Sequence, residues 1–70
     1  MSMALVQFIK DRRKQLHLTQ RDLADRSGVG IRFIRDLEQG KQTLRLDKVN
    51  QVLAVFAHQL GVVPIERNEQ

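Results

Sequence analysis

Two arginines and a glutamine, Arg32, Arg35 and Gln39, are spaced so that a helix carries all three on one face. A helix turns by about 100° per residue, which places Ile34 and Leu37 on the opposite, inward face. An arginine donates two parallel hydrogen bonds to the edge of guanine, and a single helix has the width that the major groove of DNA admits. The outward face therefore has the chemistry to read DNA bases.

Two predicted helices position this face, and their ends carry local signals. The hydroxyl of Thr19 can cap a helix start, and Asp22, three residues later, can reach back to the amide of the cap. Gly28 suits the left-handed conformation that ends a helix, Gly30 is a tolerable cap for the next helix, and Gly40 ends that second helix. Two short helices joined by such a small-residue link predict a helix-turn-helix.

Residues at fixed spacing within this segment also carry a family resemblance; they are Thr19, Gln20, Leu23, Ala24, Gly28, Val29, Ile34, Leu37, Glu38 and Gly40. The pattern resembles the phage-repressor-like (XRE, Cro/C1-type) helix-turn-helix family, and the C-terminal tail is similar to that of HipB-type antitoxins. The resemblance implies an all-α, lambda-repressor-like DNA-binding domain of four to five helices. A short C-terminal β-strand is expected to pair across a homodimer, and double-stranded DNA with a palindromic operator is the expected partner.

The residues expected to contact DNA lie at the start of the first motif helix, on the outward face of the second and in the loop that follows: Gln20, Arg21, Ile31, Arg32, Arg35, Gln39, Lys41, Thr43 and Arg45. Free amides at a helix start attract phosphate, and the resemblance implies that Gln20 both holds the DNA strand and braces the recognition helix. An exposed Ile31 could sit on a thymine methyl group, whereas Phe33 could either pack inward or face a partner protein.

Glu38 falls on the inward side of the second motif helix, where an unpaired carboxylate is costly. The resemblance implies that Arg13 pairs with it, because these residues occupy the places of a family ion pair. We therefore expect a partly buried ion pair between Arg13 and Glu38 that locks the first helix, over residues 3–16, to the recognition helix. A solvated Glu38 at the helix rim is the alternative.

The charge of the 70-residue chain is concentrated in one part. The net charge is +4 and the pI about 10.4. Residues 1–42 carry nine Lys and Arg against five Asp and Glu, whereas residues 43–70 carry three of each. The excess positive charge thus coincides with the predicted motif, as binding to phosphates requires.

The composition argues against several other classes of protein. The chain has no cysteine for a disulfide or a thiolate zinc site, and His17 and His58 are far apart in the sequence. No nucleophile with a base, carboxylate pair or phosphate loop is visible, so we expect no enzyme, no cofactor and no metal. No apolar run reaches the length of a membrane span, and a bacterial cytoplasmic location, on the nucleoid when bound, is expected. His17 stands where the family commonly has Gly and is expected to be a strained turn residue.

The C-terminal part of the chain is expected to form a dimer interface. Apolar residues from Leu46 to Gln59 predict a helix whose side residues Val52 and Val55 contact a second subunit. Gly61 is expected to end that helix. The β-branched residues Val62, Val63 and Ile65 then predict a strand that finds its partner in a second copy. The predicted organisation is a helix-turn-helix domain over residues 1–60, and a dimerisation strand with a frayed tail over residues 61–70.

The functions considered follow from these features. The first is a homodimeric, sequence-specific DNA-binding repressor. The resemblance to HipB-type proteins implies further that the repressor is the antitoxin of a HipA-like serine/threonine kinase toxin, and that the pair represses its own operon. A stand-alone phage-type repressor without a toxin, and a protein-interaction antitoxin with weak DNA binding, are the alternatives.

Overall fold

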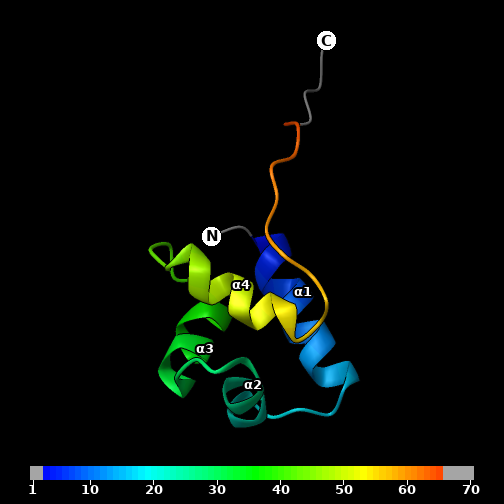
Figure 1. Cartoon of the computed structure of the whole chain (residues 1–70), viewed down its shortest axis with the longest axis vertical. Coiled ribbons are helices and arrows are strands. Elements are labelled where there is room, and N and C mark those ends of the chain that lie inside the picture. The colour runs from blue at the N-terminus through cyan, green and yellow to red at the C-terminus, as the bar shows by residue number, and fades with distance from the viewer. Residues whose placement is uncertain (1–2, 66–70) are drawn as a thin grey trace.

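The computed structural model describes residues 3–65, which form four α-helices joined by short loops (Figure 1). The helices are α1 (Met3–Gln15), α2 (Gln20–Ser27), α3 (Ile31–Glu38) and α4 (Leu46–Ala54). The predicted all-α class and the helix-turn-helix of α2 and α3 are confirmed, with no strand in the described chain. No helix in this part of the chain has the length and apolar character to cross a membrane.

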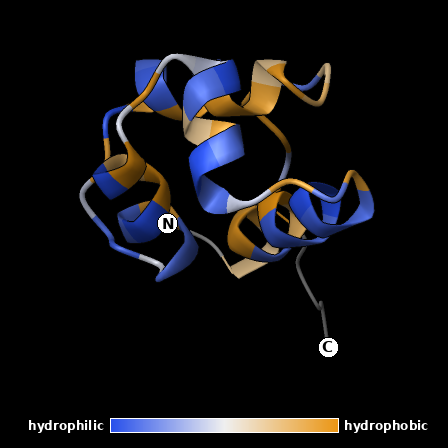
Figure 2. Ribbon diagram, turned by 90° about the horizontal axis from the view of Figure 1, so that it is seen from below, coloured by the Kyte–Doolittle hydropathy of each residue, from blue (hydrophilic) through white to orange (hydrophobic). Residues whose placement is uncertain are grey.

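Every helix contributes completely buried apolar side chains to one common core; the largest are Ile9, Leu23, Ile34, Leu37, Val49 and Val52. The helix α3 packs against both α1 and α2, and α4 packs against α2. Figure 2 shows that each helix combines hydrophilic and hydrophobic residues, as expected for helices that bury one face. The core therefore holds α3 from one side and leaves its other side at the surface.

The start and the end of α2 follow the local signals in the sequence. The Thr19 hydroxyl accepts a hydrogen bond from the Asp22 amide at 3.0 Å, and the Thr19 amide donates to Asp22 Oδ2 at 2.9 Å. The bond from the Thr19 amide stabilises the charged carboxylate and is the main cause that lowers the pKa of Asp22 below its usual value. Gly28 ends the helix with φ of 81°. The predicted capping box and C-terminal glycine are confirmed.

The turn between α1 and α2 contains a residue in the left-handed region. His17 has φ of 56°, and its amide donates to the Lys14 carbonyl at 3.0 Å. The next amide, that of Leu18, donates to the Arg13 carbonyl at 2.9 Å, and the Leu18 side chain is buried. The prediction of a strained turn residue at His17 is therefore confirmed.

The end of α4 differs from the prediction. The helix ends at Ala54 and not at Gln59, and three turn residues follow. Ala57 takes φ of 59°, the amide of His58 donates to the Leu53 carbonyl, and the Ala57 amide donates to the Ala54 carbonyl, both at 3.0 Å. These bonds form the left-handed helix ending that glycine usually provides. The sequence analysis predicted too late an end for the helix, because the residue in the left-handed conformation is an alanine and gives no glycine signal.

The prediction that Val52 contacts a second subunit is wrong. Its side chain is completely buried in the core, and Val55 is partly buried against the same core. The helix α4 packs on α2 and faces core residues from all the other helices. The core therefore encloses a wider strip of α4 than the single apolar stripe that the periodicity of the helix indicated.

The predicted strand is not formed within the single chain. Residues 61–65 have no regular secondary structure, and the chain leaves the body of the molecule at the end opposite α2 (Figure 1). Val62, Val63 and Ile65 are exposed, with relative residue exposures of 104%, 76% and 82%. The expectation of a frayed tail over residues 67–70 lies outside the described residues.

Candidate nucleic-acid interface

The outward side of α3 carries the predicted hydrogen-bond donors. Arg32 and Arg35 within α3, and Gln39 that caps its C-terminal end, are exposed, whereas Ile34 and Leu37 are completely buried. The helix begins after Gly30, whose extended backbone places it at the cap without a side-chain hydrogen bond. The donors therefore stand on a helix that is anchored along its inner side and free along its outer side, as insertion into a groove requires.

A buried network holds the C-terminal end of α3. Arg13 donates from Nε to Glu38 Oε2 at 2.8 Å and from Nη2 to Oε1 at 3.0 Å. The Glu38 side chain is 4% exposed and that of Arg13 is 15% exposed. Arg13 Nη1 also donates to the Leu18 carbonyl at 2.9 Å. The ion pair expected from the resemblance is present, and it joins α1, the turn before α2 and α3.

Gln20 extends this network to the start of α2. Its Nε2 donates to Glu38 Oε1 at 3.2 Å, and its side chain is partly buried. The neighbouring Arg21 is exposed. Gln20 thus braces α3 as the resemblance implies, and it stands in the first turn of α2, where free backbone amides suit a phosphate.

Two apolar residues of α3 are less exposed than a base-contacting role suggests. Ile31 and Phe33 are both partly buried and pack against the core. The Lys48 ammonium lies 5.9 Å from the centre of the Phe33 ring. Of the two positions left open for Phe33, the structure shows the inward one, toward α4.

The loop between α3 and α4 carries the remaining predicted contacts. Lys41, Thr43 and Arg45 are exposed. The Lys41 Nζ atom lies 3.6 Å from Asp36 Oδ2, and Arg45 pairs with Asp47, with Nη2 2.6 Å from Oδ2. The hydrogen bond from Arg45 lowers the pKa of the Asp47 carboxyl. Exposed ion pairs of this kind exchange readily, so a phosphate can take the place of either carboxylate.

Lys48 is a candidate that the sequence reasoning missed. Its ammonium lies beside the ring of Phe33, the residue that follows Arg32 in the sequence. Lys48 therefore adds a positive charge on the side where α4 meets α3. The two residues are fifteen positions apart on different helices, so only the packing of α4 reveals their proximity. No local pattern in the sequence pointed to this lysine.

The remaining predicted residues lie after α4. Val55 directly follows the end of that helix, and Val62, Val63 and Ile65 belong to the tail. The tail leaves the molecule at the end opposite α2 and so does not adjoin the motif (Figure 1).

Residues 3–65 contain no group of three or more His, Asp or Glu side chains that could hold a metal ion.

Comparison with known proteins agrees with this arrangement. A model of the helix-turn-helix family matches residues 9–61, which include α2, α3 and α4. The chain is similar to the uncharacterized HTH-type transcriptional regulator y4mF of Sinorhizobium fredii, with 43% identity over 67 residues that cover 94% of this chain and 84% of the relative. The matched region holds the buried Arg13–Glu38 pair and the whole exposed face of α3. The chain therefore belongs to the XRE-type helix-turn-helix family of DNA-binding regulators.

Proposed function

We propose that this protein is a sequence-specific transcriptional repressor that binds a palindromic operator as a homodimer. The observation that carries the proposal is the exposed row of Arg32, Arg35 and Gln39 on a helix whose other side is completely buried. In the proposed complex α3 enters the major groove, where arginine can donate to guanine and glutamine to adenine. The identity of the side chains on this row then determines which operator is preferred.

Contacts with the DNA backbone position α3 in the groove. Gln20 and Arg21 at the start of α2 approach one strand, and Lys41, Thr43 and Arg45 in the loop before α4 approach the next stretch of backbone. All five are at least partly exposed, and the buried link from Gln20 to Glu38 transmits the backbone contact to α3. Such contacts orient the protein without reading the sequence.

A homodimer follows from the geometry of a palindrome. Two copies of α3 must reach successive major grooves about 34 Å apart, and a two-fold axis relates them. The exposed aliphatic residues Val62, Val63 and Ile65 support a pairing of the two tails as a short antiparallel ribbon. Pro64 has no amide and therefore faces away from the partner strand.

A second candidate function adds a protein partner. The exposed aliphatic tail also suits an antitoxin that binds a HipA-like serine/threonine kinase toxin, with the pair repressing its own operon. A stand-alone repressor uses the same DNA surface without a toxin. Co-purification of a kinase encoded beside this gene, from cells that express both at natural levels, tests the antitoxin function. If no kinase is encoded there, the stand-alone repressor is favoured.

The deciding experiment is a titration of the purified protein with DNA from upstream of its own gene. An operator-reading repressor is expected to prefer this DNA over scrambled DNA by about 10³-fold or more, with an affinity that falls steeply as salt is raised. Weak binding without sequence preference would contradict the proposal and favour a protein-interaction antitoxin. The scrambled DNA is the control for general attraction to phosphates.

A further inference from the structure

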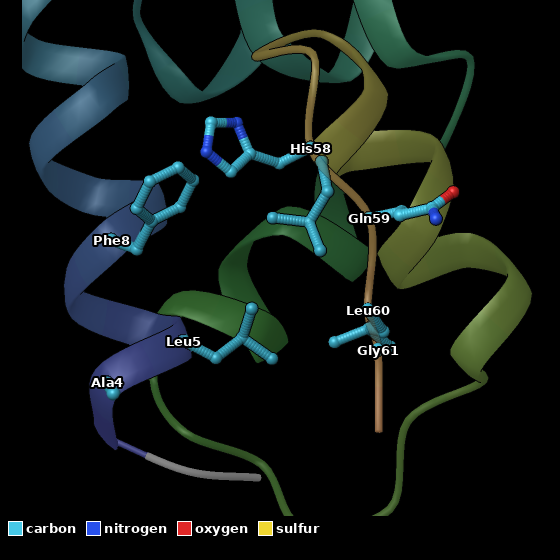
Figure 3. Close-up of a pocket in the computed structure, with 8 residues that line it drawn as sticks. Ala4, Leu5, Phe8, His58, Gln59, Leu60 and Gly61 are labelled. Carbon is cyan, nitrogen blue, oxygen red and sulfur yellow. The ribbon is translucent and has the colours of Figure 1, made fainter. Parts of the chain in front are cut away.

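An apolar groove lies between the first half of α1 and the segment that follows α4. Its volume is about 270 Å³. Ala4, Leu5 and Phe8 of α1 lie on one side, and His58, Gln59, Leu60 and Gly61 lie on the other (Figure 3). Leu53 of α4 also lines the groove. The size is well above the roughly 150 Å³ of a cavity that accommodates a benzene molecule. The groove is therefore large enough to receive aliphatic side chains.

Specific contacts fix the wall that follows α4. The His58 ring lies on the Phe8 ring with centres 4.6 Å apart, and His58 Nδ1 lies 2.7 Å from the Phe56 carbonyl oxygen. The Leu60 amide donates to Asn50 Oδ1 of α4 at 2.7 Å. Ala57, which precedes these residues in the chain, has a left-handed conformation that turns the backbone toward α1. The groove is consequently a formed feature of the fold.

The residues directly after this wall are the exposed aliphatic ones. Beyond Gly61 the chain runs away from the body, so Val62, Val63 and Ile65 do not enter the groove beside them (Figure 1). In an extended segment alternate residues share a face, which puts Val63 and Ile65 together and Val62 opposite. One molecule thus presents both an open apolar groove and an unburied apolar segment.

We propose that the groove of each protomer receives the tail of a second copy. In this arrangement the face of the ribbon that carries Val63 and Ile65 enters the groove of the partner, and Val62 lies on the opposite face. The exchange is reciprocal, as a two-fold interface requires, so both grooves are filled. It defines where the tail docks in the homodimer proposed above, and it does not depend on whether that dimer binds DNA.

The charges agree with this occupant. The Arg12 guanidinium carbon lies 5.3 Å from the centre of the Phe8 ring at one end of the groove. Ile65 is followed in the sequence by the acid Glu66, whose charge is complementary to that of Arg12.

Two adjacent residues of α1 allow a matched pair of variants, and sedimentation in the absence of DNA measures the dimer dissociation constant of each. Ala4 lines the groove and Met3 does not, and both are exposed in the first turn of the helix, where an acid is tolerated. Ala4→Glu is expected to raise the dimer dissociation constant by about tenfold or more, because it places an unpaired charge against the docked tail. Met3→Glu is expected to leave it within about twofold. Equal effects of the two variants, or none, would overturn the proposal.

The absence of cysteine from the chain allows a second test by crosslinking. A chain carrying Ala4→Cys is mixed with a differently tagged chain carrying Ile65→Cys under mild oxidation. A disulfide requires the two Cα atoms to lie within about 7 Å, so a mixed dimer is expected to form. Asp25→Cys, on an exposed position of α2, replaces Ala4→Cys in the control and is expected to form none.

Three results would contradict the proposal and identify another occupant. If one chain carrying both Ala4→Cys and Ile65→Cys closes only within itself, each tail fills its own groove. If no crosslink forms while the protein sediments as a dimer, the copies associate through another surface. If the protein is a monomer, the groove is left to a different partner. A dimer that crosslinks but fails to bind operator DNA would contradict the proposed function and leave this inference intact.

Discussion

The contact between Arg13 and Glu38 is the residue-scale feature on which the position of α3 depends. Glu38 is a charged residue inside the core, and three hydrogen bonds from Arg13 and Gln20 satisfy its two oxygens. No buried side-chain nitrogen or oxygen in the described chain lacks a partner. Such a fully satisfied network favours one orientation of the helix, because any shift of α3 leaves a charge unpaired.

Loss of the Glu38 carboxylate is expected to destabilise the fold strongly. Glu38→Ala leaves the largely buried Arg13 guanidinium without its partner and should lower the free energy of unfolding by about 3 kcal/mol. Urea denaturation of the purified variant measures the change. Lys41→Ala, which removes an exposed ion pair with Asp36, is the matched control and should cost less than about 1 kcal/mol. Similar losses in the two variants would show that the buried pair has no special role.

Arg32 is expected to determine part of the operator preference. Replacement by alanine should weaken operator binding by about 1–3 kcal/mol and relax the preference at one base pair, if the guanidinium donates to a guanine. The measurement is a titration of operator DNA and of operators changed at single positions. An equal loss on operator and scrambled DNA would instead make Arg32 a phosphate contact.

At the scale of the elements, each helix end has an identifiable cause. The helix α2 begins with reciprocal hydrogen bonds between Thr19 and Asp22 and ends at a left-handed glycine. The helix α4 ends through a left-handed alanine, Ala57, which costs more than a glycine in this conformation. The first ending is encoded locally, whereas the second persists because His58 and Leu60 find partners after the turn.

The start of α2 is expected to make stability depend on pH. The folded-state pKa of Asp22 is lowered, mainly by the hydrogen bond from the Thr19 amide, so the charged carboxylate stabilises the native state. This contribution is present above the unfolded-state pKa, about 3.9, and is lost as pH falls through the folded-state pKa. Asp22→Asn should therefore lower the melting temperature at neutral pH. Thermal melts in strong acid should show a smaller difference from the unmodified protein, and a constant difference would contradict the assignment.

The left-handed turn after α4 offers a stabilising substitution. Ala57→Gly removes the steric cost of positive φ, about 1–2 kcal/mol, and part of this gain is offset by the greater freedom of glycine in the unfolded chain. The net expectation is a protein more stable by about 0.5–1 kcal/mol, measured by urea denaturation. Ala54→Gly, at the exposed last residue of α4, has no positive φ to relieve and is the control; it should destabilise, by up to about 1 kcal/mol. Destabilisation by both would contradict the role of Ala57.

At the scale of the whole molecule, the tail and α3 have separate tasks. The tail leaves the end of the molecule opposite α2, so an interface built there does not cover the exposed face of α3 (Figure 1). A 70-residue chain buries a modest core, and a second copy adds apolar contacts that the single chain lacks. Dimerisation thus adds both stability and the two-fold symmetry that a palindromic operator matches.

Removal of residues 62–70 is expected to separate these tasks. The truncated protein keeps all four helices and should remain folded by circular dichroism, but it should sediment as a monomer. Its affinity for the full palindrome should fall by at least about 10²-fold, because the second half-site is no longer bound by a linked copy. A half-site alone should be bound as weakly as before. Unchanged affinity for the palindrome would show that the tail has no role in operator binding.

Local interactions explain what the sequence determined by itself. The helix-turn-helix, the cap at Thr19, the glycine ending of α2, the left-handed His17 and the exposed row of Arg32, Arg35 and Gln39 all depend on residues close together in the chain. Propensity and periodicity describe such short-range effects well. The Arg13–Glu38 pair spans distant residues, and it was expected only because the motif resembles a known family.

Only the tertiary structure decided the features that depend on how distant segments pack. The burial of Val52, the end of α4 at Ala54, the approach of Lys48 to Phe33 and the groove beside α1 all involve contacts between helices. The period of α4 identified its apolar residues but not how widely its neighbours enclose them. Such contacts have no local signature, because the free energy that fixes them comes from burial against residues far along the chain.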